Sequence, residues 1–152
     1  MSRTGLSALL IAAFAGGVLI AAEAKKVDLE KVKCPVSGKA VKADATVDYK
    51  DAKVYMCCQN CPKAFAKDTK KFATKANMQL VQTKQAKQVA CPITGKDVKD
   101  AVAKVAGLEI GFCCNNCKGK VDKAGDSDKL ALVFSDKAFK KGFKVPKKED
   151  TQ

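Results

Sequence analysis

One cysteine pattern occurs twice in this chain, and its two copies contain all eight cysteines. Residues 34–61 hold the first copy and residues 91–117 the second. Each copy opens with Cys-Pro-x-x-Gly-Lys and closes with Cys-Cys-x-Asn-Cys, and the gap between these runs is one residue shorter in the second copy. A repeat that keeps its sulfur positions indicates that the thiols of each copy act as a set. We therefore look for function in two equivalent cysteine sites.

The repeat extends beyond the cysteines. Residues 80–86 match residues 132–138, and the second copy is four residues shorter between its last cysteine and this segment. Matching ends around a deletion favour duplication of a whole module. We expect a module at 34–88 and another at 89–143, with a lead-in at 25–33 and a charged tail at 144–152, of which residues 147–152 should be disordered.

The residue patterns predict the same elements in both modules. Alternating β-branched and aromatic residues predict strands at 45–49 and 54–57, and again at 102–105 and 108–113, each pair forming a hairpin. A helix should follow each Cys-x-Asn-Cys run, with Gly125 closing the second one. We expect 80–81 and 132–133 to form a third strand, before a short helix capped by Thr83 or Ser135. The predicted fold class is α+β, with two tandem small modules that each combine a β-hairpin, a helix and a cysteine knuckle.

Each module has roughly 50 residues, and the chain contains no tryptophan. Units of about this size bury too little apolar surface to fold without a metal or disulfides. The cysteines are the residues available for that role.

The N-terminus has the composition of a secretory signal. Arg3 precedes an apolar run at 6–20, and the segment 22–24 reads Ala-Glu-Ala, a small-x-small cleavage site. We expect a signal peptide at 1–24, cleavage after Ala24, and a periplasmic or secreted mature protein. The alternative is an uncleaved anchor, although the apolar run is shorter than the roughly 20 residues that cross a bilayer.

Composition excludes several classes of protein. The formal net charge is +13, but Arg3 is the only arginine, and arginine provides most base contacts in nucleic-acid readout. The dispersed lysines indicate a solvated surface, with docking to an anionic lipid or polysaccharide as the alternative. The chain has no histidine, the usual general base, and no P-loop or dinucleotide motif. We therefore expect neither an enzyme nor a nucleic-acid-binding protein.

The cysteine pattern suits a soft metal. One thiol before a glycine-ended turn and two at a strand-to-helix junction can surround a single ion. The N–H groups of the turn and the helix N-terminus stabilise thiolates. Thiolates without histidine or clustered carboxylates favour Zn(II) or Cu(I) over hard cations.

The spacing, the Cys-Pro-x-x-Gly opening and the strand before the second cysteine resemble TRASH domains and the related YHS domains. These treble-clef-like modules are associated with heavy-metal sensing, trafficking and resistance. The resemblance implies about one metal ion per module, bound for handling or sensing, with a metal-delivery protein as partner. The ligands it implies are Cys34, Cys57, Cys61, Cys91, Cys113 and Cys117. Ser37 and Thr94 stand where many relatives have a further Cys or His, which leaves Cys58 and Cys114 as the remaining soft donors.

Two alternatives stay open from the sequence. Eight cysteines in a small exported chain also fit a disulfide-stapled interaction module without metal. The strings Cys58-Gln-Asn-Cys61 and Cys114-Asn-Asn-Cys117 fit a thiol–disulfide redox protein, although no thioredoxin-like βαβ pattern surrounds them. We expect Cys58 and Cys114 to contribute less than their neighbours, because adjacent side chains diverge along a strand.

Overall fold

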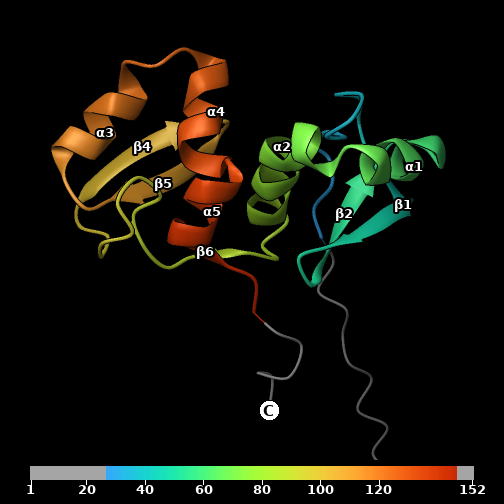
Figure 1. The fold of residues 1–152 in the computed structure, drawn as a ribbon, viewed down its shortest axis with the longest axis horizontal. Helices are drawn as coiled ribbons and strands as arrows, with labels where there is room; N and C mark the ends of the chain where they lie inside the picture. Colours follow the sequence, from blue (N-terminus) through green and yellow to red (C-terminus); the bar gives the residue numbers. More distant parts are fainter. Residues whose placement is uncertain (1–26, 147–152) are drawn as a thin grey trace, which may run out of the picture.

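The computed structural model describes residues 27–146, and Figure 1 shows their arrangement. The predicted signal peptide at 1–24 and residues 147–152 of the predicted tail lie outside this range. Among residues 27–146, no helix has both the length and the apolar character needed to cross a membrane.

Two antiparallel β-hairpins form as predicted. They are built from β1 (Lys42–Tyr49) with β2 (Ala52–Met56), and from β4 (Ala101–Val105) with β5 (Leu108–Phe112). The β1–β2 turn places Lys50 and Asp51 at positive φ, and the β4–β5 turn does the same with Ala106 and Gly107. Two successive left-handed residues give the tight turn whose twist matches that of the flanking strands. Both hairpins therefore close within two residues.

Five helices follow the hairpins, two in the first half of the described chain and three in the second. They are α1 (Asn60–Lys67), α2 (Thr69–Gln82), α3 (Asn115–Asp122), α4 (Asp126–Phe134) and α5 (Asp136–Gly142). Asp68 separates α1 from α2, and its carboxylate accepts a hydrogen bond from the Lys71 N–H at 3.1 Å. This N-cap bond starts α2 in a new direction.

The predicted third strand is wrong in both halves. Leu80 lies in α2, where it follows Ala73 and Ala76 at helical spacing on the buried face, and residues 132–133 lie in α4. An apolar pair is too short to distinguish a strand from the end of an amphipathic helix.

Two predicted caps also differ. Thr83 ends α2 instead of capping a new helix, and its hydroxyl donates to the Gln79 carbonyl at 2.8 Å. Gly125 begins α4, two residues beyond the C-cap of α3 at Lys123. Ser135 precedes α5 as expected.

One hydrophobic core runs through both halves. Helix α2 packs against α4 and α5 in the middle of the molecule, while α1 and α3 lie at opposite ends (Figure 1). Leu80 from the first half and Phe134 from the second are both fully buried in this core. A third small sheet pairs β3 (Lys87–Gln88) with β6 (Phe143–Lys144). The fold is therefore α+β, and the halves stabilise each other by burying a common apolar surface.

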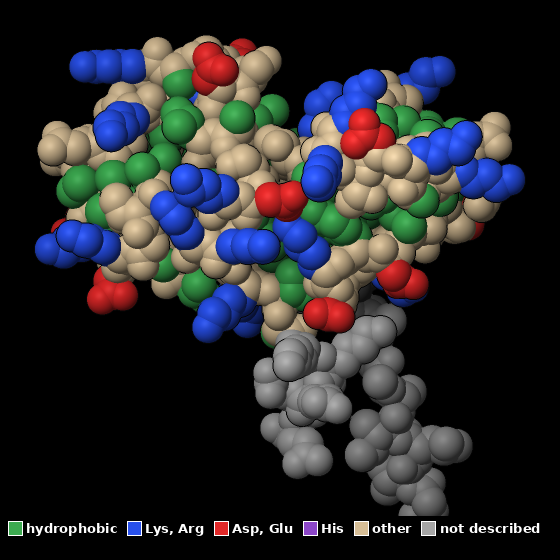
Figure 2. Space-filling view, in the orientation of Figure 1, with side chains coloured by type: hydrophobic (Ala, Val, Ile, Leu, Met, Phe, Trp, Pro, Cys, Tyr) green, Lys and Arg blue, Asp and Glu red, His purple; other side chains and the backbone are tan. Residues whose placement is uncertain are grey.

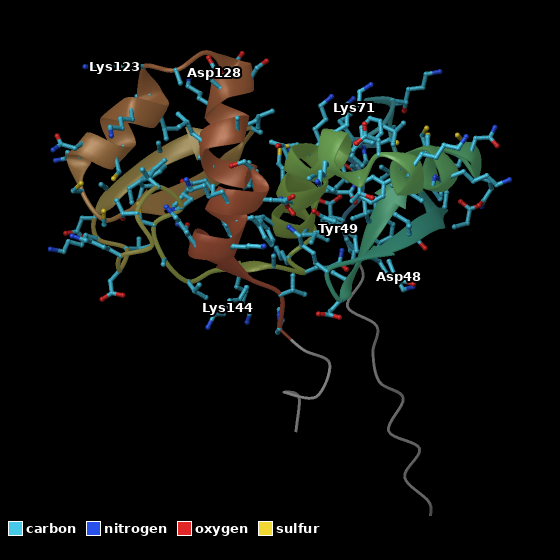
Figure 3. The ribbon with its side chains drawn as sticks, viewed as in Figure 1. Asp48, Tyr49, Lys71, Lys123, Asp128 and Lys144 are labelled. Carbon is cyan, nitrogen blue, oxygen red and sulfur yellow. The ribbon has the colours of Figure 1, made fainter. Side chains whose placement is uncertain are left out.

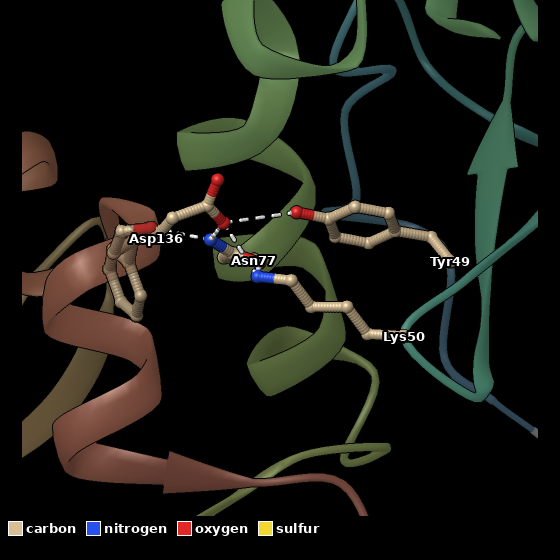
Figure 4. Close-up of polar contacts among 5 residues, drawn as sticks. Tyr49, Lys50, Asn77 and Asp136 are labelled. Carbon is tan, nitrogen blue, oxygen red and sulfur yellow. Dashed lines mark hydrogen bonds and ion pairs between the residues drawn. The ribbon is translucent and has the colours of Figure 1, made fainter.

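A polar network joins the halves beside this core (Figure 4). Asp136 accepts hydrogen bonds from the Lys50 ammonium at 2.6 Å, the Asn77 amide at 3.1 Å and the Tyr49 hydroxyl at 3.2 Å. Asn77, which is fully buried, also donates to the Phe134 carbonyl at 2.8 Å. The side chain of Asp136 is 47% exposed, so the network closes the rim of the joint and leaves its centre apolar.

Candidate metal centres

A hydrogen-bonded turn positions the first cysteine of each copy. The Cys34 N–H donates to the Lys39 carbonyl at 2.8 Å, and the Gly38 N–H donates to the Cys34 carbonyl at 2.8 Å. Gly38 has a φ of +74°, where a side chain would strain the backbone. The second copy repeats both bonds and the left-handed glycine at Cys91, Gly95 and Lys96. Both first cysteines are buried.

The other two ligand candidates come from the junction between hairpin and helix. Strand β2 ends at Met56, so Cys57 is the first residue after it, and Cys61 lies in the first turn of α1. Cys113 and Cys117 take the same places after β5 and in α3. The two sites share no residue, and α1 and α3 lie at opposite ends of the molecule. Sulfur atoms are visible near both helices in Figure 3.

The structure brings each predicted triad together. The Sγ atoms of Cys34, Cys57 and Cys61, here called the first cysteine site, all lie within 4.8 Å of one another. The same holds for the second cysteine site, formed by Cys91, Cys113 and Cys117. Sulfur atoms bound to one Zn(II) ion at about 2.3 Å lie about 3.8 Å apart in a tetrahedral arrangement. The measured Sγ–Sγ distances, 3.5 Å for Cys57–Cys61 and 3.7 Å for Cys113–Cys117, fit a shared ion with small adjustments.

All eight cysteines lie within the described residues, and all are free thiols in this structure. The Sγ separations of 3.5 Å and more are well above the roughly 2.05 Å of a disulfide bond. The geometry is that of grouped thiols.

Cys58 and Cys114 do not point away from their neighbours, contrary to the expectation from strand alternation. The Sγ of Cys58 lies 3.8 Å from that of Cys57 and 3.5 Å from that of Cys61. The Sγ of Cys114 lies 3.8 Å from that of Cys113. Alternation does not apply because β2 and β5 end one residue before each pair. Both extra thiols are exposed, whereas the first and third cysteines of each site are buried.

Ser37 and Thr94 lie beside the sulfur atoms. The Ser37 Oγ is 3.1 Å from the Cys57 Sγ, and the Thr94 Oγ1 is 3.2 Å from the Cys113 Sγ. Each hydroxyl also accepts a backbone N–H at 3.3 Å, from Lys39 or Lys96. With one lone pair engaged by that N–H, the hydroxyl proton is free to point at the sulfur and to stabilise a thiolate.

Hydrogen bonds favour the thiolate at the first cysteine of each site. Burial by itself raises the pKa of Cys34, but the Ser37 N–H, the Ser37 hydroxyl and the Cys57 N–H outweigh it and lower the pKa to about 7. The pKa of Cys91 is also lowered to about 7, because the Cys113 N–H and the Thr94 hydroxyl and N–H outweigh burial. One thiolate per site is therefore accessible near neutral pH.

The third cysteine of each site has the opposite tendency. Burial, followed by hydrogen bonds with the neighbouring thiols Cys58 and Cys57, raises the pKa of Cys61. Burial and the thiol of Cys113 raise the pKa of Cys117 to about 12. Without a cation these groups hold their protons, so metal uptake at either site must release protons to solvent.

Two glutamine side chains hold the cysteine-bearing segments together. Gln79, which is fully buried on α2, accepts the Tyr55 N–H at 2.6 Å and donates to the carbonyls of Tyr55 and Lys33 at 2.8 and 3.1 Å. Lys33 directly precedes Cys34, and Tyr55 lies two residues before Cys57. The amide thus connects the turn of the first cysteine to the strand that leads to the second.

Gln88 makes the same connection in the second half, from a different element. Its amide on β3 accepts the Gly111 N–H at 3.0 Å and donates to the carbonyls of Gly111 and Ala90 at 2.7 and 3.0 Å. Ala90 precedes Cys91, and Gly111 lies two residues before Cys113. We call the Gln79 and Gln88 arrangements the glutamine ties.

The sequence analysis did not identify the glutamine ties. For Gln79 a signal exists, because it is a polar residue three positions after Ala76, at the spacing that continues the apolar face of the helix. For Gln88 there is none, since its position depends on the pairing of β3 with the distant β6.

Comparisons with known proteins give no match: no family model, no curated protein and no solved structure is similar to this chain. The functional assignment is therefore argued from the two cysteine sites and their surroundings.

Proposed function

We propose that this chain is an exported protein that binds soft metal ions, Zn(II) or Cu(I), at one thiolate site in each half, for metal handling or sensing without catalysis. The observation that carries the proposal is the convergence of three Sγ atoms within 4.8 Å at both sites. Six cysteines that are separated in sequence meet in two groups of the same construction, which supports a ligand common to both.

The donors favour a soft ion. Each site offers sulfur, with a hydroxyl held against one sulfur at 3.1 or 3.2 Å, and the chain has no histidine. Three thiolates complete the trigonal environment that suits Cu(I), and they leave Zn(II) an exchangeable fourth position. In a protein of net charge +13, several thiolates near a dication also carry less electrostatic cost than they would in an acidic protein.

The repeated construction supports two TRASH/YHS-like modules. In both halves a buried cysteine opens a glycine turn, a hairpin follows, and the last cysteine lies in the first turn of a helix. The shared core argues that the modules fold together, while the separation of α1 from α3 argues that they load independently (Figure 1).

Native mass spectrometry of the protein purified from its own compartment, without added reductant, tests the proposal. We expect two zinc or two copper ions per chain after exposure to either metal, and loss of both on treatment with a strong chelator. A metal-free protein that has lost eight hydrogen masses would contradict the proposal and favour a disulfide-stapled module. Reversible loss of two or four hydrogen masses would favour a redox role, for which the 3.5 Å Cys58–Cys61 separation provides a suitable pair.

A further inference from the structure

The first cysteine site overlaps a second group of sulfur atoms that faces solvent. The Sγ atoms of Cys57, Cys58 and Cys61 form a nearly equilateral triangle with sides of 3.8, 3.5 and 3.5 Å. These lengths are close to the roughly 3.8 Å expected between two thiolates on one ion. The triangle shares Cys57 and Cys61 with the inner site and replaces the buried Cys34 by the exposed Cys58.

The second half repeats this overlap. The exposed Cys114 has its Sγ 3.8 Å from that of Cys113, which in turn lies 3.7 Å from the Sγ of Cys117. An exposed thiol therefore lies beside two members of the inner site in the first copy and beside Cys113 in the second.

We propose that Cys57, Cys58 and Cys61, and likewise Cys113, Cys114 and Cys117, form outer thiolate sites through which the metal passes between the buried inner site and an acceptor thiol in solution. This inference rests on the proposed function, because it assumes that the inner sites bind a metal. It assigns the extra cysteines a kinetic role: they provide a route for exchange and add little to affinity at equilibrium.

The exchange is a sequence of ligand substitutions without electron transfer. Cys58 gives its proton to solvent and bonds to the metal as the bond from Cys34 breaks, and the N–H groups of the turn stabilise the thiolate left on Cys34. Acceptor thiolates then bond to the metal at the exposed face one after another, and each new bond replaces one of the bonds from the three outer cysteines. The thiolates left on the protein take back from solvent the protons that were given up on loading.

Stopped-flow transfer from the loaded protein to a coloured chelator tests the route. The probes are Zn(II) with 4-(2-pyridylazo)resorcinol and Cu(I) with bicinchoninate. In Cys58→Ala we expect the phase that carries half of the transfer amplitude to become about tenfold slower, while the other half keeps its rate. The equilibrium affinity for the metal should change by less than about threefold. Cys114→Ala should slow the other half, and the double variant both. Gln59→Ala, the exposed neighbour of Cys58, is the matched control and should leave the rate unchanged.

The outcomes that would contradict the exchange route can be distinguished from those that would contradict metal binding itself. Unchanged transfer in the double variant would overturn the exchange role while leaving the proposed function intact. A loss of equilibrium affinity in Cys58→Ala equal to that in Cys57→Ala would also overturn it, since Cys58 would then be a permanent fourth ligand. A wild-type protein that binds neither ion would overturn both proposals.

Discussion

The two cysteine sites have the same cysteines in the same places, yet different elements hold them. In the first half the glutamine tie comes from the long helix α2, after the cysteines in the chain. In the second half it comes from the two-residue strand β3, before the cysteines. The repeat alignment places Gln79 opposite Ala131, so the second copy lacks the residue that the first copy uses. Both copies keep a glutamine that connects the turn of the first cysteine to the strand that leads to the second cysteine. The element that carries this glutamine differs between the copies.

The strongest test of the comparison removes one sulfur from each site in turn. Cys61→Ser should abolish binding of one metal equivalent and leave the other, and Cys117→Ser should do the same, because the sites share no ligand. Native mass spectrometry gives the stoichiometry, and Ser127→Ala, far from every cysteine in the sequence, is the control. Retention of two equivalents with unchanged affinity in either variant would refute the ligand assignment.

The shared core should make the halves unfold together despite their separate sites. Phe134 is fully buried at the joint, so Phe134→Ala should lower the free energy of unfolding by about 3–5 kcal/mol. Urea denaturation of the loaded protein should give a single transition, since the first half loses packing as well. Phe72→Ala, at a partly buried position, should cost less. Two separate transitions in the variant would show that the halves fold independently.

The glutamine ties can be tested one at a time against an internal control. Replacing Gln79 by Met keeps the length of the side chain but removes three hydrogen bonds, and should weaken the first site by about 10–100-fold. Gln88→Met should weaken only the second site. Gln85 bonds to the N–H and carbonyl of Lys53 on the same β2 strand without reaching the cysteine turn. Gln85→Met should therefore reduce stability without changing metal affinity, as followed by competition with a chelator.

If Gln85→Met lowered the metal affinity of the first site as much as Gln79→Met does, the glutamine ties would affect metal binding only through the overall stability of the fold. The d–d absorption of Co(II)-substituted protein provides a second readout. Gln79→Met should alter the coordination spectrum of one site, which a loss of stability alone would not do.

The smallest expected effect concerns the polar network at the joint. Burial opposes ionisation of Asp136, but bonds from Lys50 and Asn77 outweigh it, so the pKa of the carboxyl is below its usual 3.8. A lowered folded-state pKa contributes stability above pH 3.8, and this contribution is lost as the pH falls through the folded-state value. Asp136→Asn should cost about 1 kcal/mol or less at pH 7, because the group is 47% exposed and screened by solvent. The difference from wild type should vanish in acid denaturation below that pKa, and a constant difference would contradict this account.

The features predicted correctly from the sequence were those determined by residues close together in the chain. The hairpins follow from alternation and turn residues, and the grouping of Cys34 with Cys57 and Cys61 follows from a spacing that is preserved twice. The prediction of a third strand failed because an apolar pair such as 80–81 does not distinguish a strand from the end of a helix, and the apolar face of α2 packs against the distant α4 and α5. The predicted orientations of Cys58 and Cys114 were wrong because each strand ends one residue earlier than expected. Side-chain alternation along a strand therefore does not apply to these two residues. Gln88 could not be predicted, since its place depends on a strand pairing with Phe143.

The position of Gln88 limits which fragment of the second half could be transferred to another protein as a unit. Its amide lies ahead of Cys91 in the chain, and β3 is held in place by β6 at the far end of the same half. The boundary expected from the repeat, after residue 88, would leave this glutamine with the first half. A fragment starting at residue 89 would carry all three thiols without the glutamine that connects their segments. A fragment from Lys87 to Lys144 would carry the thiols, the glutamine and both strands of its small sheet. Transplanting this cysteine site into another protein therefore requires residues that the cysteine repeat does not mark.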